Sequence, residues 1–343
     1  MLSPTLRLKE DKMKFLTVNG KIQVRNGKAI TVPDDYDNSL IKIGNNLVKT
    51  STGLIGKYVT PGLYDTNDQL VKSWSQLVSE GLVTVTSGTL GSVNNSLEGK
   101  MFIPNSINTI GSSAFKDCAS LISVNIPDSV TSIGEEAFIY CDSLASINIP
   151  ESITSIEPHT FTGCGNLTSI NIPRSVTTIG NGAFNSTGLT SFEIPDSVIS
   201  IGSSVIENTS IGSIYIPDTV TSISEMAFAN CTITSIRLPN SITNIPKMLC
   251  YATLLKSVTI PNSVTSIGEE AFSFCDDITT ITMSTNITNI GSGAFKDSTK
   301  LETITYKNRK SKWNSITFGD YWCPYSLPFV VKCLDGNIQY NET

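Results

Sequence analysis

The stretch SVTSIGEEAFIYCDSLASINIPESITSI, residues 129–156, ends on nearly the same residues with which it begins. Ser129-Val-Thr-Ser-Ile133 returns 23 residues later as Ser152-Ile-Thr-Ser-Ile156. A fixed period of about 20 to 50 residues is typical of solenoids, propellers and other repeat arrays. The sequence around this stretch therefore has to be interpreted as a repeat before any single motif is considered.

The same unit recurs along most of the chain, and its clearest marker is a proline that follows a strand-like segment. Successive prolines are 22 or 23 residues apart, and Ser284 and Lys307 continue the register without proline. The prolines are Pro104, Pro127, Pro150, Pro173, Pro195, Pro217, Pro239 and Pro261.

Residues 121–127, LISVNIP, show what one unit contains. Val124 and Ile126 lie two residues apart and share one face, whereas Ser123 and Asn125 face the other way, as in a short strand with one apolar side. Pro127 lacks an N–H group and ends the strand. We expect equivalent strands at residues 101–103, 124–126, 147–149, 170–172, 192–194, 214–216, 236–238, 258–260, 281–283 and 304–306.

A single unit cannot be stable by itself. Burying a large apolar side chain contributes about 1.5–3 kcal/mol, whereas fixing the backbone of each residue costs about 1–2 kcal/mol. Stacked units share one apolar column, and their strands pair into a parallel sheet. The repeat therefore predicts a solenoid.

The pattern L-x-x-I-x-I-P followed by V-T-S-I-G-x-x-A-F-x-x-C, over residues 97–307, resembles the BspA-like class of leucine-rich repeats of bacterial surface proteins. The resemblance implies a leucine-rich-repeat solenoid of the α/β horseshoe type, with short parallel strands on the concave side and an irregular convex side. It also implies adhesion or recognition rather than catalysis.

Three segments follow from the extent of the repeat. Residues 1–90 do not repeat and predict a small α+β head, with a hairpin at Asn19-Gly20, another Asn-Gly at residues 26–27, and a helix whose capping box is Ser73-Trp-Ser-Gln76. Residues 91–307 form the solenoid. Residues 308–343 form a C-terminal cap, because aromatic residues gather from Tyr306 to Phe329 and an open column must be closed.

Composition limits the partners. The net charge is −6, which disfavours a nucleic-acid backbone as a ligand. No run reaches about 18 apolar residues, so no membrane span is expected. The chain shows no signal peptide or anchor, and we expect a cell surface or a virion as its location on the resemblance alone.

Few residues suggest chemistry. Cys118, Cys141, Cys164, Cys231 and Cys275 occupy the same place in their turns, which predicts buried free thiols. Cys323 and Cys333 lie outside the repeat, and either a disulfide or two free thiols fits them. His159 is the single histidine and cannot build a multi-histidine metal site. We expect no catalytic residues, no metal and no cofactor.

One outward row of the predicted sheet changes character in its middle, where Glu193, Tyr215 and Arg237 follow one another on adjacent rungs. Exposed tyrosine and arginine are common binding hot spots, so these three residues are the candidate ligand contact. The expected partner is a protein or a glycan on a host or neighbouring cell.

Two alternative functions remain open. Residues 20–27 and Gly62-Leu-Tyr-Asp65 resemble attachment segments of gut-phage structural proteins, which implies a head-fibre, decoration or tail protein of a virion. The other alternative is an intracellular scaffold. In each case the N-terminal segment could attach the protein or join copies into a homo-oligomer.

Overall fold

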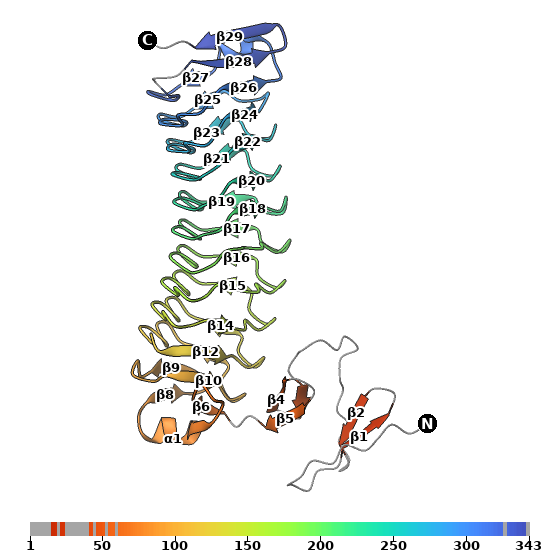
Figure 1. Ribbon diagram of the computed structural model, residues 1–343, viewed down its shortest axis with the longest axis vertical. Coiled ribbons are helices and arrows are strands. Elements are labelled where there is room, and N and C mark those ends of the chain that lie inside the picture. The colour runs from red at the N-terminus through yellow and green to blue at the C-terminus, as the bar shows by residue number, and fades with distance from the viewer. Residues whose placement is uncertain are drawn as a thin grey trace.

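The computed structural model describes residues 61–324 and 328–340 in full and, of residues 1–60, the backbone of five short strands. From residue 61 onward the chain winds turn upon turn into one column (Figure 1). The predicted solenoid is confirmed. Each turn contributes up to two very short strands, and these pair in parallel with the same strands of neighbouring turns.

The first ladder contains the predicted I-x-I-P strands, and we call its outward side the strand face. Eight of the ten predicted rungs are found, and residues 170–172 and 192–194, which were predicted as strands, form none. The strands are β10 (Gly99–Phe102), β12 (Leu121–Asn125), β14 (Ser146–Ile147), β18 (Ser213–Tyr215), β20 (Ser235–Arg237), β22 (Ser257–Thr259), β24 (Thr280–Met283) and β26 (Thr303–Tyr306).

The second ladder was not predicted, because all of its strands but the first have only two residues, too few to show a period. It contains the second short strand of each turn, which in most turns is followed by a glycine that allows two main chains to approach closely. A Cβ atom on Gly134 would lie 2.5 Å from the backbone nitrogen of Ser112. The strands are β9 (Thr89–Val93), β11 (Thr109–Ile110), β13 (Ser132–Ile133), β15 (Ser155–Ile156), β16 (Thr178–Ile179), β17 (Ser200–Ile201), β19 (Ser222–Ile223), β21 (Asn244–Ile245), β23 (Ser266–Ile267), β25 (Asn289–Ile290) and β27 (Thr317–Phe318).

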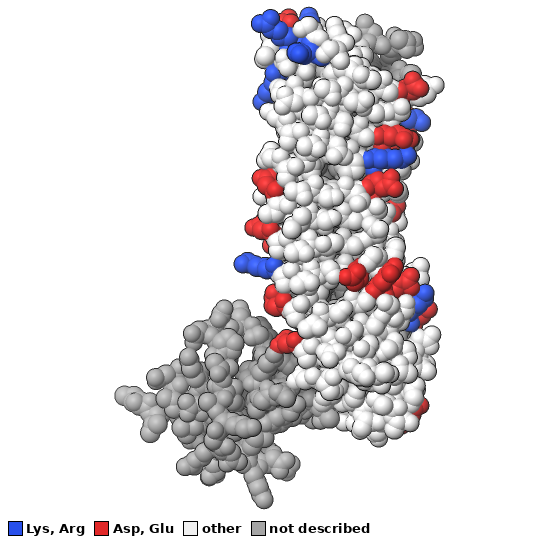
Figure 2. All heavy atoms as spheres, turned by 180° about the vertical axis from the view of Figure 1, so that it is seen from behind, with Lys and Arg blue, Asp and Glu red and all other residues white. Residues whose placement is uncertain are grey.

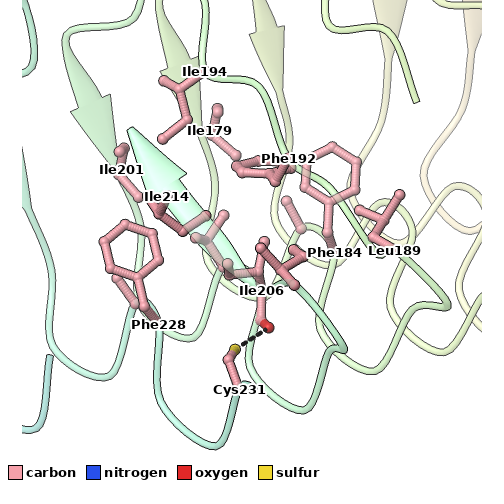
Figure 3. Close-up of a cluster of buried hydrophobic side chains, with 14 of the residues drawn as sticks. Ile179, Phe184, Leu189, Phe192, Ile194, Ile201, Ile206, Ile214, Phe228 and Cys231 are labelled. Carbon is pink, nitrogen blue, oxygen red and sulfur yellow. Dashed lines mark hydrogen bonds between the residues drawn. The ribbon is translucent and has the colours of Figure 1, made fainter. Parts of the chain in front are cut away.

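Identical side chains stack through the core. The rings of Phe115 and Phe138 are 4.7 Å apart, and those of Phe161 and Phe184 are 5.5 Å apart, with planes 14° and 8° from parallel. These separations are close to the roughly 4.8 Å between paired strands, so each ring meets its counterpart one turn away. Figure 3 shows the same column between residues 179 and 231, where Ile206 replaces the phenylalanine.

Small polar side chains join successive turns inside the column. The Ser175 hydroxyl donates to the Ile153 carbonyl at 2.6 Å, and the Ser197 hydroxyl donates to the Val176 carbonyl at 2.7 Å. The buried thiols do the same: Cys164 donates to the Phe138 carbonyl at 3.2 Å. The prediction of buried free thiols is confirmed for all five cysteines named from the repeat.

The N-terminal end of the column is covered by β6 (Gly62–Tyr64), β7 (Leu70–Ser73), α1 (Trp74–Ser79) and β8 (Val83–Thr86). The predicted capping box is confirmed, since the Ser73 hydroxyl accepts from the Gln76 N–H and the Gln76 side chain accepts from the Ser73 N–H. Leu77 is fully buried beneath the first turn. Because β9 already pairs with β11, the expected boundary between residues 90 and 91 falls inside a strand of the ladder.

The strands before residue 61 form two further sheets. β1 (Phe15–Val18) and β2 (Lys21–Val24) pair antiparallel across two residues, which confirms the hairpin predicted at Asn19-Gly20. β3 (Ile41–Ile43), β4 (Asn46–Ser51) and β5 (Leu54–Tyr58) form an antiparallel sheet. The second Asn-Gly, at residues 26–27, lies outside the described residues.

Aromatic residues cover the C-terminal end. After α2 (Lys310–Trp313), β28 (Phe329–Cys333) pairs in parallel with β26 and antiparallel with β29 (Gly336–Tyr340). Trp313 is buried and donates from its indole nitrogen to the Tyr340 hydroxyl at 3.1 Å. Trp322 packs against Trp313 and Tyr340, so ring faces close the apolar column on this side.

The serine that lies two residues after a repeat proline offers a matched comparison between two turns, at Ser175 and Ser263. Ser263 is the one buried side-chain hydroxyl of the described residues that has no hydrogen-bond partner, whereas Ser175 is bonded. We expect Ser175→Ala to lower the free energy of unfolding by about 0.5–1.5 kcal/mol, and Ser263→Ala to leave it unchanged or to raise it, because an unsatisfied buried hydroxyl is itself unfavourable. Denaturant midpoints of the two variants measure the difference; equal losses would contradict the inter-turn role of the serine hydroxyl.

The buried thiols should be chemically protected. Burial raises the pKa of Cys118 and Cys164 to about 12 and that of Cys275 to about 11, and the thiolate is the reactive form. Near neutral pH we expect iodoacetamide to leave the buried cysteines of the repeat unlabelled in the folded protein, while unfolding exposes all 8 cysteines, as intact-mass spectrometry would show. Rapid labelling of Cys141 or Cys164 in the folded state would contradict this.

The same experiment tests the predicted bridge between Cys323 and Cys333. If the bridge is present, two of the labels will appear only after the unfolded chain has been reduced.

Candidate functional site

The ladder of the strand face is interrupted near its middle. β14 is the last strand of one sheet and β18 is the first strand of the next, and residues 170–172 and 192–194 between them are not paired with a neighbouring strand. Ile147 and Ile170 are only partly buried there, although most inward residues of the other rungs are fully buried. The turns here lack main-chain pairing on the strand face, and two of their inward side chains are partly exposed.

An asparagine marks the last closed rung before this gap. The Asn148 side chain accepts from the Ile126 N–H at 2.9 Å and donates to the Ile126 carbonyl at 2.7 Å. It thus satisfies the peptide groups that a longer strand would have paired. No equivalent bond is made by Asn171 or Glu193 among the described residues, so the main chain beyond Asn148 opens.

A groove of about 740 Å³ lies over the gap. This volume is within the range of ordinary ligand sites, about 300–1,000 Å³. Its lining combines partly apolar main-chain segments with serine hydroxyls, charged groups and one aromatic ring: Glu151, Ile170, Asn171, Ile172, Arg174, Ser191, Phe192, Glu193, Ile194, Pro195, Asp196, Ser197, Ser213 and Tyr215.

Strand alternation places Glu193 and Tyr215 on the strand face. Figure 3 shows their neighbours Phe192, Ile194 and Ile214 among the buried side chains of the column. Successive residues of an extended chain point to opposite sides, so Glu193 and Tyr215 point outward. Tyr215 is 60% exposed, which is unusual for so large a side chain in this molecule.

Arg237 contacts Tyr215 instead of lining the groove. Its guanidinium carbon lies 4.8 Å from the centre of the Tyr215 ring, a cation–π arrangement. The same guanidinium donates to the Ile216 carbonyl and to the Asp218 carboxylate, both at 2.6 Å. The hydrogen bond with Asp218 raises the pKa of Arg237, and the Arg237 hydrogen bond lowers the pKa of Asp218. Of the three residues predicted from the sequence, Glu193 and Tyr215 therefore line the groove. Arg237 does not line it and packs against the Tyr215 ring.

Sequence reasoning missed three charged residues of the groove: Glu151, Arg174 and Asp196. Each is the residue that directly follows a repeat proline. The signal was present, because this position also carries Asp128 and Asp218 and so forms an acidic row with Arg174 as its single cation. The row was overlooked because only positions inside the predicted strands were compared.

Charge is sparse on the rest of the column. In Figure 2 most charged side chains of the visible face lie toward its two long edges, and much of the area between them is uncharged. The groove carries three carboxylates and one guanidinium, those of Glu151, Glu193, Asp196 and Arg174. None of these four forms a salt bridge with another described residue. The groove is thus a locally acidic site whose charges are not neutralised by the protein itself.

The other residues singled out from the sequence have structural surroundings. His159 has a positive φ of 54°, and its ring packs against Gly182, where a Cβ atom would lie 2.5 Å from Nδ1. Cys323 and Cys333 are both free thiols in the structure, and the bridge between them remains a prediction. Among the described residues there is no group of three or more histidine, cysteine or acidic residues that could hold a metal ion. Over the same part of the chain, every helix is too short or too polar to cross a membrane.

Comparison with known proteins agrees with this architecture. The BspA type leucine rich repeat region matches residues 94–211 and 199–322, in 6 copies. A leucine-rich repeat protein from Bacteroides ovatus is similar in structure, with a TM-score of 0.52 and 26% identity over 69% of this chain and 74% of that chain. No curated protein matches significantly.

Two further solved structures match at lower similarity. A leucine rich cell surface protein from Faecalibacterium prausnitzii has 23% identity and a TM-score of 0.33, over 92% of this chain and 98% of that chain. The pneumococcal vaccine antigen PcpA has 18% identity and a TM-score of 0.45, over 92% and 93% of the two chains. With the family match spanning nearly the whole column, the chain belongs to the BspA-type leucine-rich-repeat family.

Proposed function

We propose that this protein is a non-enzymatic recognition or adhesion protein that binds a protein or glycan partner through the groove on its strand face. The observation that carries the proposal is the exposed Tyr215 beside the interrupted ladder. Its ring is held by Arg237 at 4.8 Å and borders a groove of about 740 Å³. A large exposed aromatic side chain that is fixed by its neighbours loses little conformational freedom on binding, which is characteristic of hot spots.

The rest of the column supports a binding role rather than catalysis. A solenoid offers an extended outer surface, and its repeated turns hold that surface stiffly. The five cysteines named from the repeat are buried and donate to carbonyl groups, and the single histidine packs against Gly182 of the next turn. The adhesive role itself is an inference from the family, since a fold alone does not determine function.

The alternatives have less support in the described residues. Gly62–Tyr64, part of one segment that resembles phage attachment proteins, is β6, which pairs with β10 and closes the first turn. The other segment, residues 20–27, contains β2 (Lys21–Val24), and its remaining residues lie outside the described part of the chain. A virion protein and an intracellular scaffold therefore remain alternatives, and so does attachment or self-association through residues 1–90.

Loss of Tyr215 tests the proposal. With a glycan microarray and an immobilised peptide array as probes, we expect Tyr215→Ala to weaken binding to the ligands found by about tenfold or more, because hot-spot truncations cost about 2 kcal/mol or more. Thr259→Ala is the matched control, since Thr259 is an exposed outward residue of β22. Surface plasmon resonance measures both variants. Equal binding by wild-type protein and Tyr215→Ala would contradict the role of the groove.

A further inference from the structure

Beside the groove, the protein itself places a cation against the Tyr215 ring. Arg237 lies over one face of Tyr215 at 4.8 Å, and the carboxylate of Asp218 neutralises the guanidinium from 2.6 Å away. Asp218 directly follows a repeat proline. An aromatic ring on the strand face and an acidic residue after the proline thus form a complete guanidinium site within one turn.

The preceding turn repeats the acidic half of this arrangement and lacks the cation. Asp196 follows its proline as Asp218 does. Glu193 lies one turn before Tyr215, at the position that Arg237 occupies one turn after it. Both carboxylates line the groove together with the Tyr215 ring, and neither forms a salt bridge within the described residues. The ring, 60% exposed, therefore has an internal cation on one side and unneutralised carboxylates on the groove side.

We propose that the groove binds a cationic side chain, arginine above all, carried by an extended segment of a partner protein. The guanidinium would lie against Tyr215 and pair with Glu193 and Asp196. A stacked and ion-paired guanidinium gains both a cation–π contact and charge-assisted hydrogen bonds. This inference rests on the proposed function and narrows its partner class from protein or glycan to a basic protein segment.

The open ladder explains why the segment should be extended. The main chains of residues 170–172 and 192–194 are unpaired with neighbouring strands, so their N–H and C=O groups can bond an extended chain lying in the groove.

Charge favours a basic peptide over a glycan as the ligand of the groove. A neutral sugar could stack on Tyr215 but would leave the carboxylates without a counter-charge. Sialylated or sulfated glycans would meet three carboxylates against one guanidinium.

Synthetic peptides test the inference directly. The probe is acetyl-Gly-Ser-Arg-Ser-Arg-Ser-Gly-amide, and its control carries citrulline, which keeps the shape of arginine without the charge. We expect the arginine peptide to bind the full chain about tenfold or more tightly than the citrulline peptide, as measured by titration in NMR spectra. The chemical shift changes should centre on Tyr215, and added salt should weaken binding.

Variants of the full chain complete the test. Glu193→Gln combined with Asp196→Asn should lower the affinity for the arginine peptide by about tenfold, whereas Glu225→Gln, an exposed carboxylate outside the groove, should not change it. Thermal unfolding verifies that each variant is folded. Equal affinity for both peptides, equal affinity in the double variant, or absence of binding up to the solubility limit would overturn the inference. If Tyr215→Ala abolishes binding of a glycan that arginine peptides do not displace, the proposed function stands and the basic partner does not.

Discussion

Every turn of this protein depends on hydrogen bonds to the turns on either side. One turn contains a few very short strands and a stripe of apolar side chains, which is too little to offset the backbone entropy lost on ordering it. Bonds between residues 22 or 23 apart, such as Phe138 N–H to the Thr160 carbonyl at 2.9 Å, connect it to the next copy. The same bonds offset local strain. Tyr140 and Phe274 adopt positive φ, which costs about 1–2 kcal/mol for such residues, and each donates its N–H to the following turn at 2.8 and 2.9 Å.

This dependence explains why polar side chains are so regular inside the column. In most turns the serine that precedes the inward valine or isoleucine, and the cysteine or threonine that follows the phenylalanine position, is small enough to be buried and still donates a hydrogen bond to a carbonyl group. Ser263 makes no such bond within the described residues. Burial keeps the thiols protonated, so the cysteines act as small hydrogen-bond donors rather than as nucleophiles. Aromatic residues serve a different purpose at the C-terminal end, where Trp313 and Trp322 cover the last turn in place of a further copy.

The candidate site lies where this regularity fails. Where the ladder is closed, the strand face is a row of small hydroxyl and amide side chains with few distinguishing features. Between β14 and β18 the rungs are unpaired, Ile170 becomes partly exposed, and a groove opens beside Tyr215. The stacked turns on either side hold the ring and the surrounding carboxylates in place. The ladder of the strand face is also interrupted between β20 and β22, but the interruption between β14 and β18 is the one that leaves two successive turns without a paired strand. A stiff scaffold with such a local interruption offers a physical route from a repeat to the proposed binding surface.

The amino-acid sequence by itself determined the solenoid, because spacing of 22 or 23 residues between prolines and the alternation in residues such as Val124 and Ile126 leave few other ways to bury the apolar side chains. It also determined local devices that depend only on neighbouring residues, namely the Ser73 capping box and the hairpin between β1 and β2. It indicated Glu193, Tyr215 and Arg237 as an unusual triplet. It did not indicate that Arg237 would lie against the Tyr215 ring and form an ion pair with Asp218. Only the tertiary structure decided where the ladder opens, since residues 170–172 and 192–194 have the same alternating pattern as rungs that do pair. Pairing depends on the distance between whole turns, which is set by packing throughout the column and not by the residues of one strand.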